Sequence, residues 1–110
     1  MIEPIGAQQQ LQVLERAESF IVQAEQLFAR DFARIPVRFD LRGTTAGMYK
    51  IEGARLQIRF NPWIFAKYFE VNLRDTVPHE VAHYIVHAVY GDRRIKPHGW
   101  GSAWCPKGGA

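Results

Sequence analysis

Cysteine is almost absent from this sequence, and long apolar runs are absent altogether. The 110 residues include one cysteine, Cys105, which excludes an internal disulfide. No apolar stretch approaches the roughly 20 residues that a helix needs to span a bilayer. Residues 1–10, MIEPIGAQQQ, lack the basic region and the following apolar region of a secretory signal. We therefore expect a cytoplasmic protein with no membrane association.

Internal repeats, low-complexity tracts and linkers are also missing, so nothing in the sequence divides the chain into several domains. A hydrophobic content of 47% in 110 residues suits one small globular domain that needs no disulfide. The net charge of +3 is mild, but residues 30–60 contain seven Arg or Lys against three acids. This bias is compatible with an ordinary solvated surface and with a basic binding face.

The spacing of apolar residues predicts an α+β domain. Between Gln8 and Phe32 they recur every three or four positions, as in an amphipathic helix. The residues that make this pattern are Leu11, Leu14, Ala17, Phe20, Ile21, Ala24, Leu27 and Phe28. Segments 37–41, 46–51 and 55–60 read as strands, which predicts a small three-stranded and largely antiparallel sheet. A further helix is expected to begin at Asn61, whose side chain can cap it.

All four histidines lie in the last third of the chain, in and after a segment that is expected to form a helix capped by Thr76. His79 and His83 are one helical turn apart on the same face, so both can reach one cation. This is the zinc-binding HExxH pattern, and Glu80 lies off the histidine row, where it can act as a general base. The pattern also arises by chance, but the rest of the helix is apolar and buried imidazoles need polar partners.

A catalytic zinc site usually has three protein ligands, so a third one is needed. The candidates are His87, Asp92 and His98, since no other histidine or acid follows Glu80. His87 continues the row but lies a further turn along the helix axis. Asp92 is followed by two arginines, for which ion pairing is the expected role. His98 lies where a chain that has reversed after the helix can return over it, and we predict it as the third ligand.

The segment TVPHEVAHYIVH, followed by KPHG, resembles the SprT-like zinc metalloprotease domain. This family includes bacterial SprT and the protease core of eukaryotic Spartan. The resemblance continues upstream through AEQLFARDF, VRFDLRGTTAG and LQIRFNPWIF, covers about Phe20 to Gly99, and is closer to the bacterial members. It implies a zincin-like α+β fold with the sheet beside the HExxH helix. It also implies that His79, His83 and His98 bind Zn²⁺ and that Glu80 is catalytic.

The end of the sequence departs from the family pattern. Family members usually have an HGxxW or HGxxF signature that leads into another helix, and bacterial members continue into a cysteine-containing zinc ribbon. Here the corresponding segment is HGWGSAW, and CPKGGA follows it. With one cysteine, this chain alone cannot build a second zinc site of that kind. We therefore expect a single SprT-like domain over residues 1–110 that is truncated or degenerate at its C-terminus.

Together these features predict a zinc metallopeptidase that hydrolyses a protein or peptide substrate by metal-activated water. Spartan-like proteases act on proteins crosslinked to DNA, so the resemblance extends the expectation to DNA-associated substrates. The residues expected to contact DNA phosphates, without sequence preference, are Arg55, Arg59, Arg93, Arg94 and Lys96. The alternative is a non-catalytic module, in which zinc stabilises the fold and the basic residues bind DNA or another protein.

Overall fold

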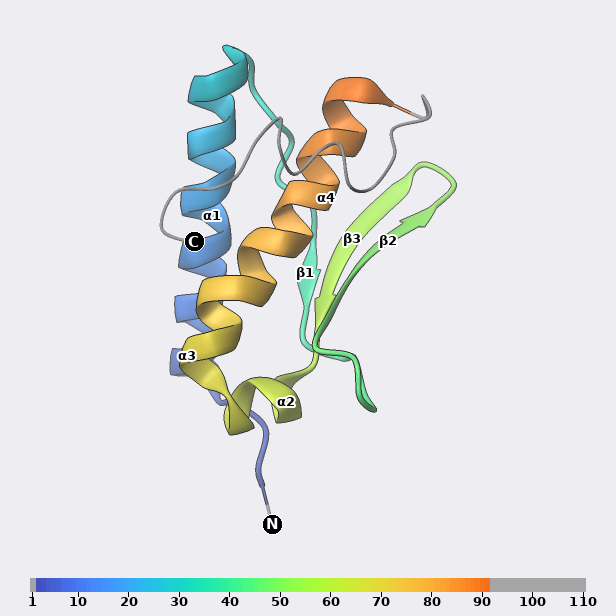
Figure 1. The fold of residues 1–110 in the computed structure, drawn as a ribbon. Coiled ribbons are helices and arrows are strands. Elements are labelled where there is room, and N and C mark those ends of the chain that lie inside the picture. The colour runs from blue at the N-terminus through green and yellow to red at the C-terminus, as the bar shows by residue number, and fades with distance from the viewer. Residues whose placement is uncertain (1, 92–110) are drawn as a thin grey trace.

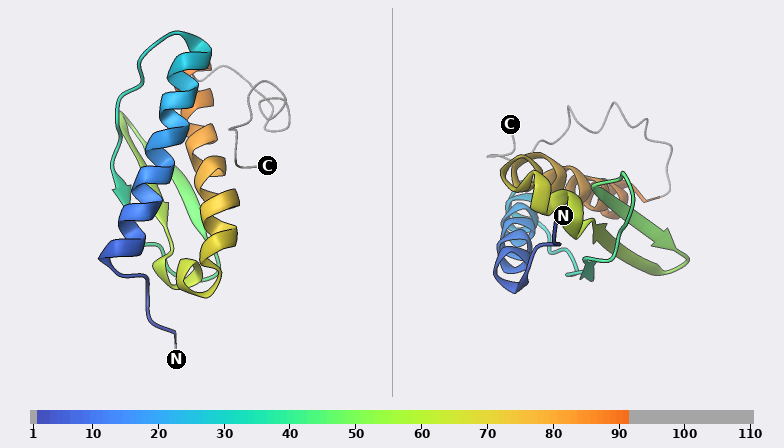
Figure 2. Two further views of the ribbon diagram at one scale, coloured as in Figure 1. Left: turned by 90° about the vertical axis from the view of Figure 1, so that its left-hand side faces the viewer. Right: turned by 90° about the horizontal axis from the view of Figure 1, so that it is seen from below.

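A computed structural model of the chain describes residues 2–91. The elements follow in the order α1 (Ala7–Phe28), β1 (Val37–Arg38), β2 (Gly47–Glu52), β3 (Arg55–Phe60), α2 (Pro62–Lys67), α3 (Phe69–Val71), the π-helical turn η1 (Asn72–Thr76) and α4 (Val77–Tyr90). Helices α1 and α4 lie side by side on one face of the sheet (Figure 1). Figure 2 shows that no helix of the described residues covers the other face. The predicted α+β class is confirmed.

The sheet is mixed, and the prediction of a largely antiparallel sheet was wrong. Its order is β1-β3-β2, with β3 antiparallel to β2 and parallel to β1. After β1 the chain continues along β3, where the Leu41 N–H donates to the Phe60 carbonyl at 3.2 Å. It then wraps around the end of β3, because the side chain of Asn61 binds the Gly43 carbonyl at 3.1 Å. The chain therefore enters β2 on the opposite side of β3 from β1.

Helix α1 ends four residues earlier than the apolar pattern predicts. Ala29 has a left-handed backbone with φ of 53°, which ends the helix after Phe28. The Glu25 carboxylate then accepts a hydrogen bond from the Phe32 N–H at 2.9 Å. A side chain of α1 thus fixes the segment that follows the helix. The apolar residues beyond Phe28 therefore belong to the loop that leads to β1.

The buried face of α1 agrees with the expected one at Ala17, Phe20, Ile21 and Ala24 and differs from it at the leucines. Its buried residues are Val13, Ala17, Phe20, Ile21 and Ala24. Leu11, Leu14 and Leu27 are 54%, 39% and 57% exposed. The core between α1, α4 and the sheet is formed around the large buried side chains Phe20, Ile58, Phe60, Phe65 and Ile85.

Helix α4 continues directly from η1, so the expected N-cap at Thr76 was wrong. The Thr76 backbone is helical, and its hydroxyl group donates to the buried Asn72 side chain at 2.6 Å. Pro78 has no N–H for the helical hydrogen bond to the preceding turn, and the wider π-helical turn lies just before it. By contrast, Asn61 caps α2 as predicted, accepting from the N–H groups of Trp63 and Ile64. Within the described residues, no helix has the length and apolar character needed to cross a membrane.

Candidate metal and catalytic site

His79 and His83 lie one turn apart on α4, and their side chains meet. The two Nε2 atoms are 3.0 Å apart, and the rings stand edge to face with centroids 4.6 Å apart. Burial, together with the neighbouring His79, lowers the pKa of His83 below its ordinary value. His83 is therefore neutral at pH 7, and a neutral imidazole is the form that binds a metal. Two imidazole nitrogens that converge in this way fit two ligands of one zinc ion.

Glu80 lies beside the histidine pair, between α4 and the edge strand β2. Its side chain is almost fully buried, with 7% exposure. Burial raises the pKa of Glu80 to about 7, an effect that a backbone hydrogen bond from Tyr49 partly offsets. A cation held by His79 and His83 would lower this pKa again, because an opposite charge favours the ionised carboxylate. The site thus places a proton-accepting group next to two potential metal ligands.

Gly47 permits this arrangement, although no functional role was expected for this residue from the sequence. A Cβ atom at Gly47 would lie 2.9 Å from Thr76 Cγ2, 3.0 Å from Glu80 Cγ and 3.2 Å from Phe60 Cδ1. Only glycine therefore allows β2 to approach α4 this closely at the level of Glu80. A glycine inside a strand often marks such a close backbone approach, and that was the available signal.

We expect Gly47→Ala to destabilise the protein by about 1–3 kcal/mol, the usual effect of forcing a methyl group into a packed interior. Chemical denaturation followed by circular dichroism measures this change. Gly6→Ala is the control for steric contact, because a Cβ at Gly6 has no heavy atom within 4 Å, and its only expected cost is the lower preference for alanine at the N-cap of α1. Equal losses of unfolding free energy in the two variants would show that the close approach at Gly47 has no energetic importance.

The outer edge of β2 pairs with no other strand of the described residues. The Asn61 N–H donates to the Ala46 carbonyl at 2.9 Å, and these two residues are directly opposite in the register. Because hydrogen-bonded pairs alternate in an antiparallel ladder, every second residue of β2 directs its backbone groups away from β3. These residues are Gly47, Tyr49 and Ile51. This edge strand runs past Glu80, since a Cβ at Gly47 would lie 3.0 Å from Glu80 Cγ.

His87, the third histidine of α4, is engaged elsewhere. Its Nδ1 is 2.9 Å from the hydroxyl oxygen of Tyr49. Within residues 2–91, no group of three or more His, Cys, Asp or Glu side chains is placed to hold a metal ion. His87 is thus not gathered with His79 and His83. The other two candidates for the third ligand, Asp92 and His98, lie outside the described residues, and the choice of His98 stays a prediction.

The predicted DNA-contacting residues are only partly within the described chain. Arg55 and Arg59 alternate with the buried residues of β3, on the sheet face that the helices leave uncovered. Arg59 forms an ion pair with Asp40 at 2.8 Å. Among the described residues, no ion pair involves Arg55. The predicted contacts at Arg93, Arg94 and Lys96 lie outside the described residues.

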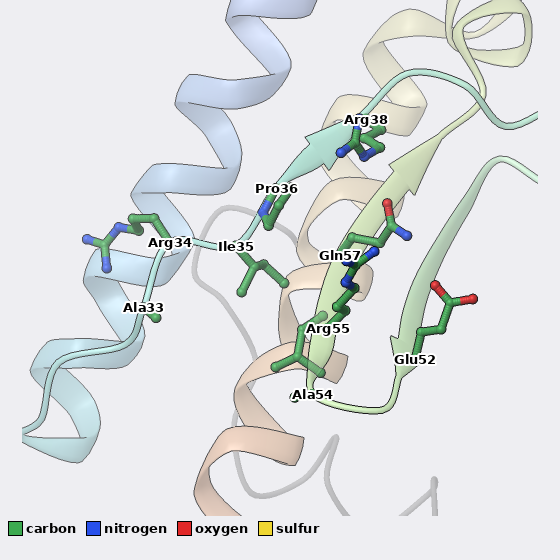
Figure 3. A pocket seen from close by; sticks show the side chains of 10 residues that line it. Ala33, Arg34, Ile35, Pro36, Arg38, Glu52, Ala54, Arg55 and Gln57 are labelled. Carbon is green, nitrogen blue, oxygen red and sulfur yellow. The ribbon is translucent and has the colours of Figure 1, made fainter.

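A groove with a volume of about 560 Å³ lies between the start of β3 and the segment that leads into β1 (Figure 3). Arg34, Arg38 and Arg55 are among its lining residues. Arg34 is held in ion pairs of 2.8 Å with Glu18 and with Glu25, whereas Arg38, like Arg55, has no ion pair within the described chain. The lining also includes Glu52, which forms an ion pair of 3.7 Å with Lys50, so the groove contains three arginines and one carboxylate.

These observations describe an α+β protein whose HExxH helix packs against the edge strand of a small mixed sheet. The chain belongs to the SprT-like family, which matches residues 17–107. It is 44% identical over 88 residues to Protein SprT of Pseudomonas syringae pv. tomato, covering 80% of this chain and 52% of that protein. It is 41% identical over 90 residues to Protein SprT of Shewanella oneidensis, covering 82% and 55%.

A third relative, Protein SprT of Pseudomonas aeruginosa, is 45% identical over 84 residues, covering 76% of this chain and 49% of the relative. The chain thus spans about half the length of the curated relatives that it matches. No solved structure matches it.

Proposed function

We propose that this chain is the core of a zinc-dependent metallopeptidase that hydrolyses peptide bonds in protein or peptide substrates. The observation that supports this most strongly is the convergence of the His79 and His83 Nε2 atoms, 3.0 Å apart, beside the buried Glu80. A structural zinc site has four protein ligands and no use for a nearby base, whereas a catalytic site requires one. His98 is the proposed third ligand.

The roles of the residues follow from their positions. When bound, zinc would supply Lewis-acid chemistry, polarising a peptide carbonyl and acidifying water. Glu80 accepts the proton of the attacking water and then passes it to the nitrogen of the leaving amine, so the same carboxylate acts first as base and then as acid. Its nearly complete burial keeps bulk water from competing for that proton.

The free edge of β2 is the proposed binding place of the substrate backbone. An extended peptide that adds to this edge as a further strand would form hydrogen bonds through its main chain, and its sequence would matter little. The edge passes Glu80, so such a peptide would bring a carbonyl group close to the base. Strand β3 has no free edge, because it lies between β1 and β2.

The test is hydrolysis of an unfolded protein, such as denatured casein, by protein whose zinc content has been measured. We expect about one zinc per chain, hydrolysis that a chelator abolishes, and recovery on addition of zinc. His83→Ala should lose both the metal and the activity. Gln57→Ala, on the face of the sheet away from α4, is the control and should keep both. Protein that is fully loaded with zinc but does not hydrolyse the substrate would contradict the proposal.

The second candidate is a zinc-stabilised module that binds DNA or protein, and the unpaired charge of Arg38 and Arg55 favours it. Nucleic-acid contact is also compatible with a peptidase, as a means of bringing the enzyme to DNA-associated substrates. Binding through phosphate contacts would be weak, independent of base sequence and strongly reduced by salt. Hydrolysis together with DNA binding would support the combined function, and DNA binding alone would support the module.

We expect the combined substitution of Arg93, Arg94 and Lys96 by Glu to abolish DNA binding while the zinc content stays unchanged. On the described face, Arg55→Glu should weaken binding and reduce the slope of log affinity against log salt by about one. Arg74→Glu makes the same change of charge at a residue that is paired with Asp75, and it serves as the control. Fluorescence anisotropy with a labelled oligonucleotide at several salt concentrations measures each affinity. Unchanged binding in the triple variant would exclude this segment as the contact.

A further inference from the structure

Tyr49 connects the edge strand to the HExxH helix through its side chain. Its hydroxyl oxygen is 2.9 Å from His87 Nδ1, and the two rings are 6.0 Å apart between centroids. The Tyr49 ring is also 6.0 Å from the ring of Tyr84, another residue of α4. Burial, with a smaller contribution from Tyr84, raises the pKa of Tyr49 to about 12. The hydroxyl group therefore keeps its proton at neutral pH, and a tyrosine hydroxyl can both donate and accept a hydrogen bond.

The backbone of the same strand lies beside the proposed base. A Cβ at Gly47, two residues before Tyr49, would lie 3.0 Å from Glu80 Cγ. Glu80 and His87 are seven residues apart, which is two helical turns, so they lie on one face of α4. Strand β2 thus meets α4 at two heights, through its backbone beside Glu80 and through the Tyr49 hydroxyl group at His87.

The two contacts fix how β2 lies along α4. Contact at Gly47 sets only the closeness of strand and helix, because it is a packing contact without direction. A hydrogen bond at Tyr49 adds a preferred position along the helix axis, since such bonds weaken steeply when the geometry changes. A general base must lie within hydrogen-bonding distance of the proton that it removes, so small displacements of Glu80 affect catalysis.

We propose that Tyr49 is a positioning residue, whose hydrogen bond to His87 holds the edge strand in register with α4 and so keeps Glu80 in place beside the backbone of β2. The catalytic part of this inference rests on the proposed peptidase function. The structural part does not, because it concerns the position of a carboxylate relative to a strand. The same contact gives His87 a role in this inference, as the anchor of the Tyr49 hydroxyl group.

The first measurement needs no activity. Amide hydrogen exchange at residue 49, followed by NMR in the full chain, reports whether β2 stays packed against α4 beside Glu80. In the wild type this amide should exchange more slowly than the amide of Ile51 on the same free edge. In Tyr49→Phe, which removes only the hydroxyl group, exchange at residue 49 should become about tenfold faster. Tyr84→Phe is the matched control, because the Tyr84 hydroxyl donates to the Ala33 carbonyl and does not contact Glu80.

The second measurement uses hydrolysis. Tyr49→Phe should lower kcat about tenfold with KM changed less than twofold and zinc content unchanged, whereas Tyr84→Phe should retain kcat despite a similar loss of thermal stability. His87→Phe should reproduce the loss of kcat, and His87→Gln should restore most of it, because the amide side chain can again bind the hydroxyl group. The double variant Tyr49→Phe/His87→Phe should be no worse than either single one.

The outcomes separate the two proposals. Faster exchange at residue 49 and a selective loss of kcat support the positioning role. Exchange and kcat that change no more in Tyr49→Phe than in Tyr84→Phe overturn it. Should the zinc-loaded wild type hydrolyse nothing, the peptidase function fails, and the exchange measurement alone decides whether Tyr49 holds β2 against α4 beside Glu80. A loss of zinc in His87→Phe but not in Tyr49→Phe would show that His87 is a ligand and would also overturn the assignment.

Discussion

The Glu80→Gln variant is expected to retain zinc and the fold and to lose nearly all hydrolytic activity. Glutamine has the size of glutamate, and its amide oxygen can still accept the hydrogen bond from the Tyr49 N–H. It cannot accept the proton of the attacking water. Because a positioned general base contributes about 10²–10⁴-fold to the rate, kcat should fall by a factor in that range.

The stability of Glu80→Gln should not decrease together with its activity. Glu80 is a carboxyl group with 7% exposure, so ionising it in the metal-free chain is unfavourable. Replacing it by a neutral amide removes that charge, and the free energy of unfolding should be unchanged or somewhat larger. Loss of activity combined with undiminished stability would identify Glu80 as a functional residue rather than a structural one.

The decisive experiment compares three quantities in matched preparations of the wild type and two variants. Zinc content, thermal unfolding and kcat for an unfolded protein substrate are compared in the wild type, in Glu80→Gln and in Glu70→Gln. Glu70 is an exposed acid on α3, and its substitution should change none of the three quantities. If Glu80→Gln hydrolyses the substrate at the wild-type rate, Glu80 is not the base.

The sequence was most informative where local patterns determine local structure. HExxH on an otherwise apolar segment predicted a buried helix with two histidines on one face, and α4 has this form. The cap at Asn61 was also predictable, because it depends on a few adjacent residues. These features require no knowledge of how distant segments pack.

The predictions that were wrong concern features that depend on contacts between distant segments of the chain. The position of β1 depends on hydrogen bonds of Leu41 and Asn61 to other parts of the chain, and strand patterns do not specify them. The face of α1 that is buried depends on which neighbour it meets. The choice of Val13 over Leu14 therefore cannot be made from periodicity, which both residues fit.

The candidate site shows the same division. His79, Glu80 and His83 are identified by spacing alone, within five consecutive residues. The contact of Tyr49 with His87 joins residues 38 positions apart. Gly47 likewise meets Thr76 and Glu80 only after folding. The spacing of residues in one sequence can indicate ligands and a base. The residues that position them can be identified only from the folded structure.

His98→Ala is expected to weaken zinc binding far more than His87→Ala, and this prediction tests the choice of the third ligand. The described chain supplies two converging imidazoles, whereas a catalytic site usually has three protein ligands. His87 is bound through Nδ1 to Tyr49, so its removal should disturb the strand beside the site without removing a ligand. Changes in residues that only support the ligands typically cost about 10–100-fold in metal affinity. Loss of a ligand should exceed that range.

Competition with a chromophoric chelator measures the affinities, and thermal unfolding with and without zinc gives an independent measure. A metal that binds only the folded chain stabilises it by about 2.7 kcal/mol when present at 100 times its dissociation constant. The wild type and His87→Ala should therefore unfold at higher temperature with zinc, whereas His98→Ala should gain little. Asp92→Asn is the third arm and should resemble the wild type, since an amide has the size of the carboxylate but is a weaker zinc ligand. Equal losses in His87→Ala and His98→Ala would contradict the ligand choice, and a loss confined to Asp92→Asn would assign the third position to Asp92.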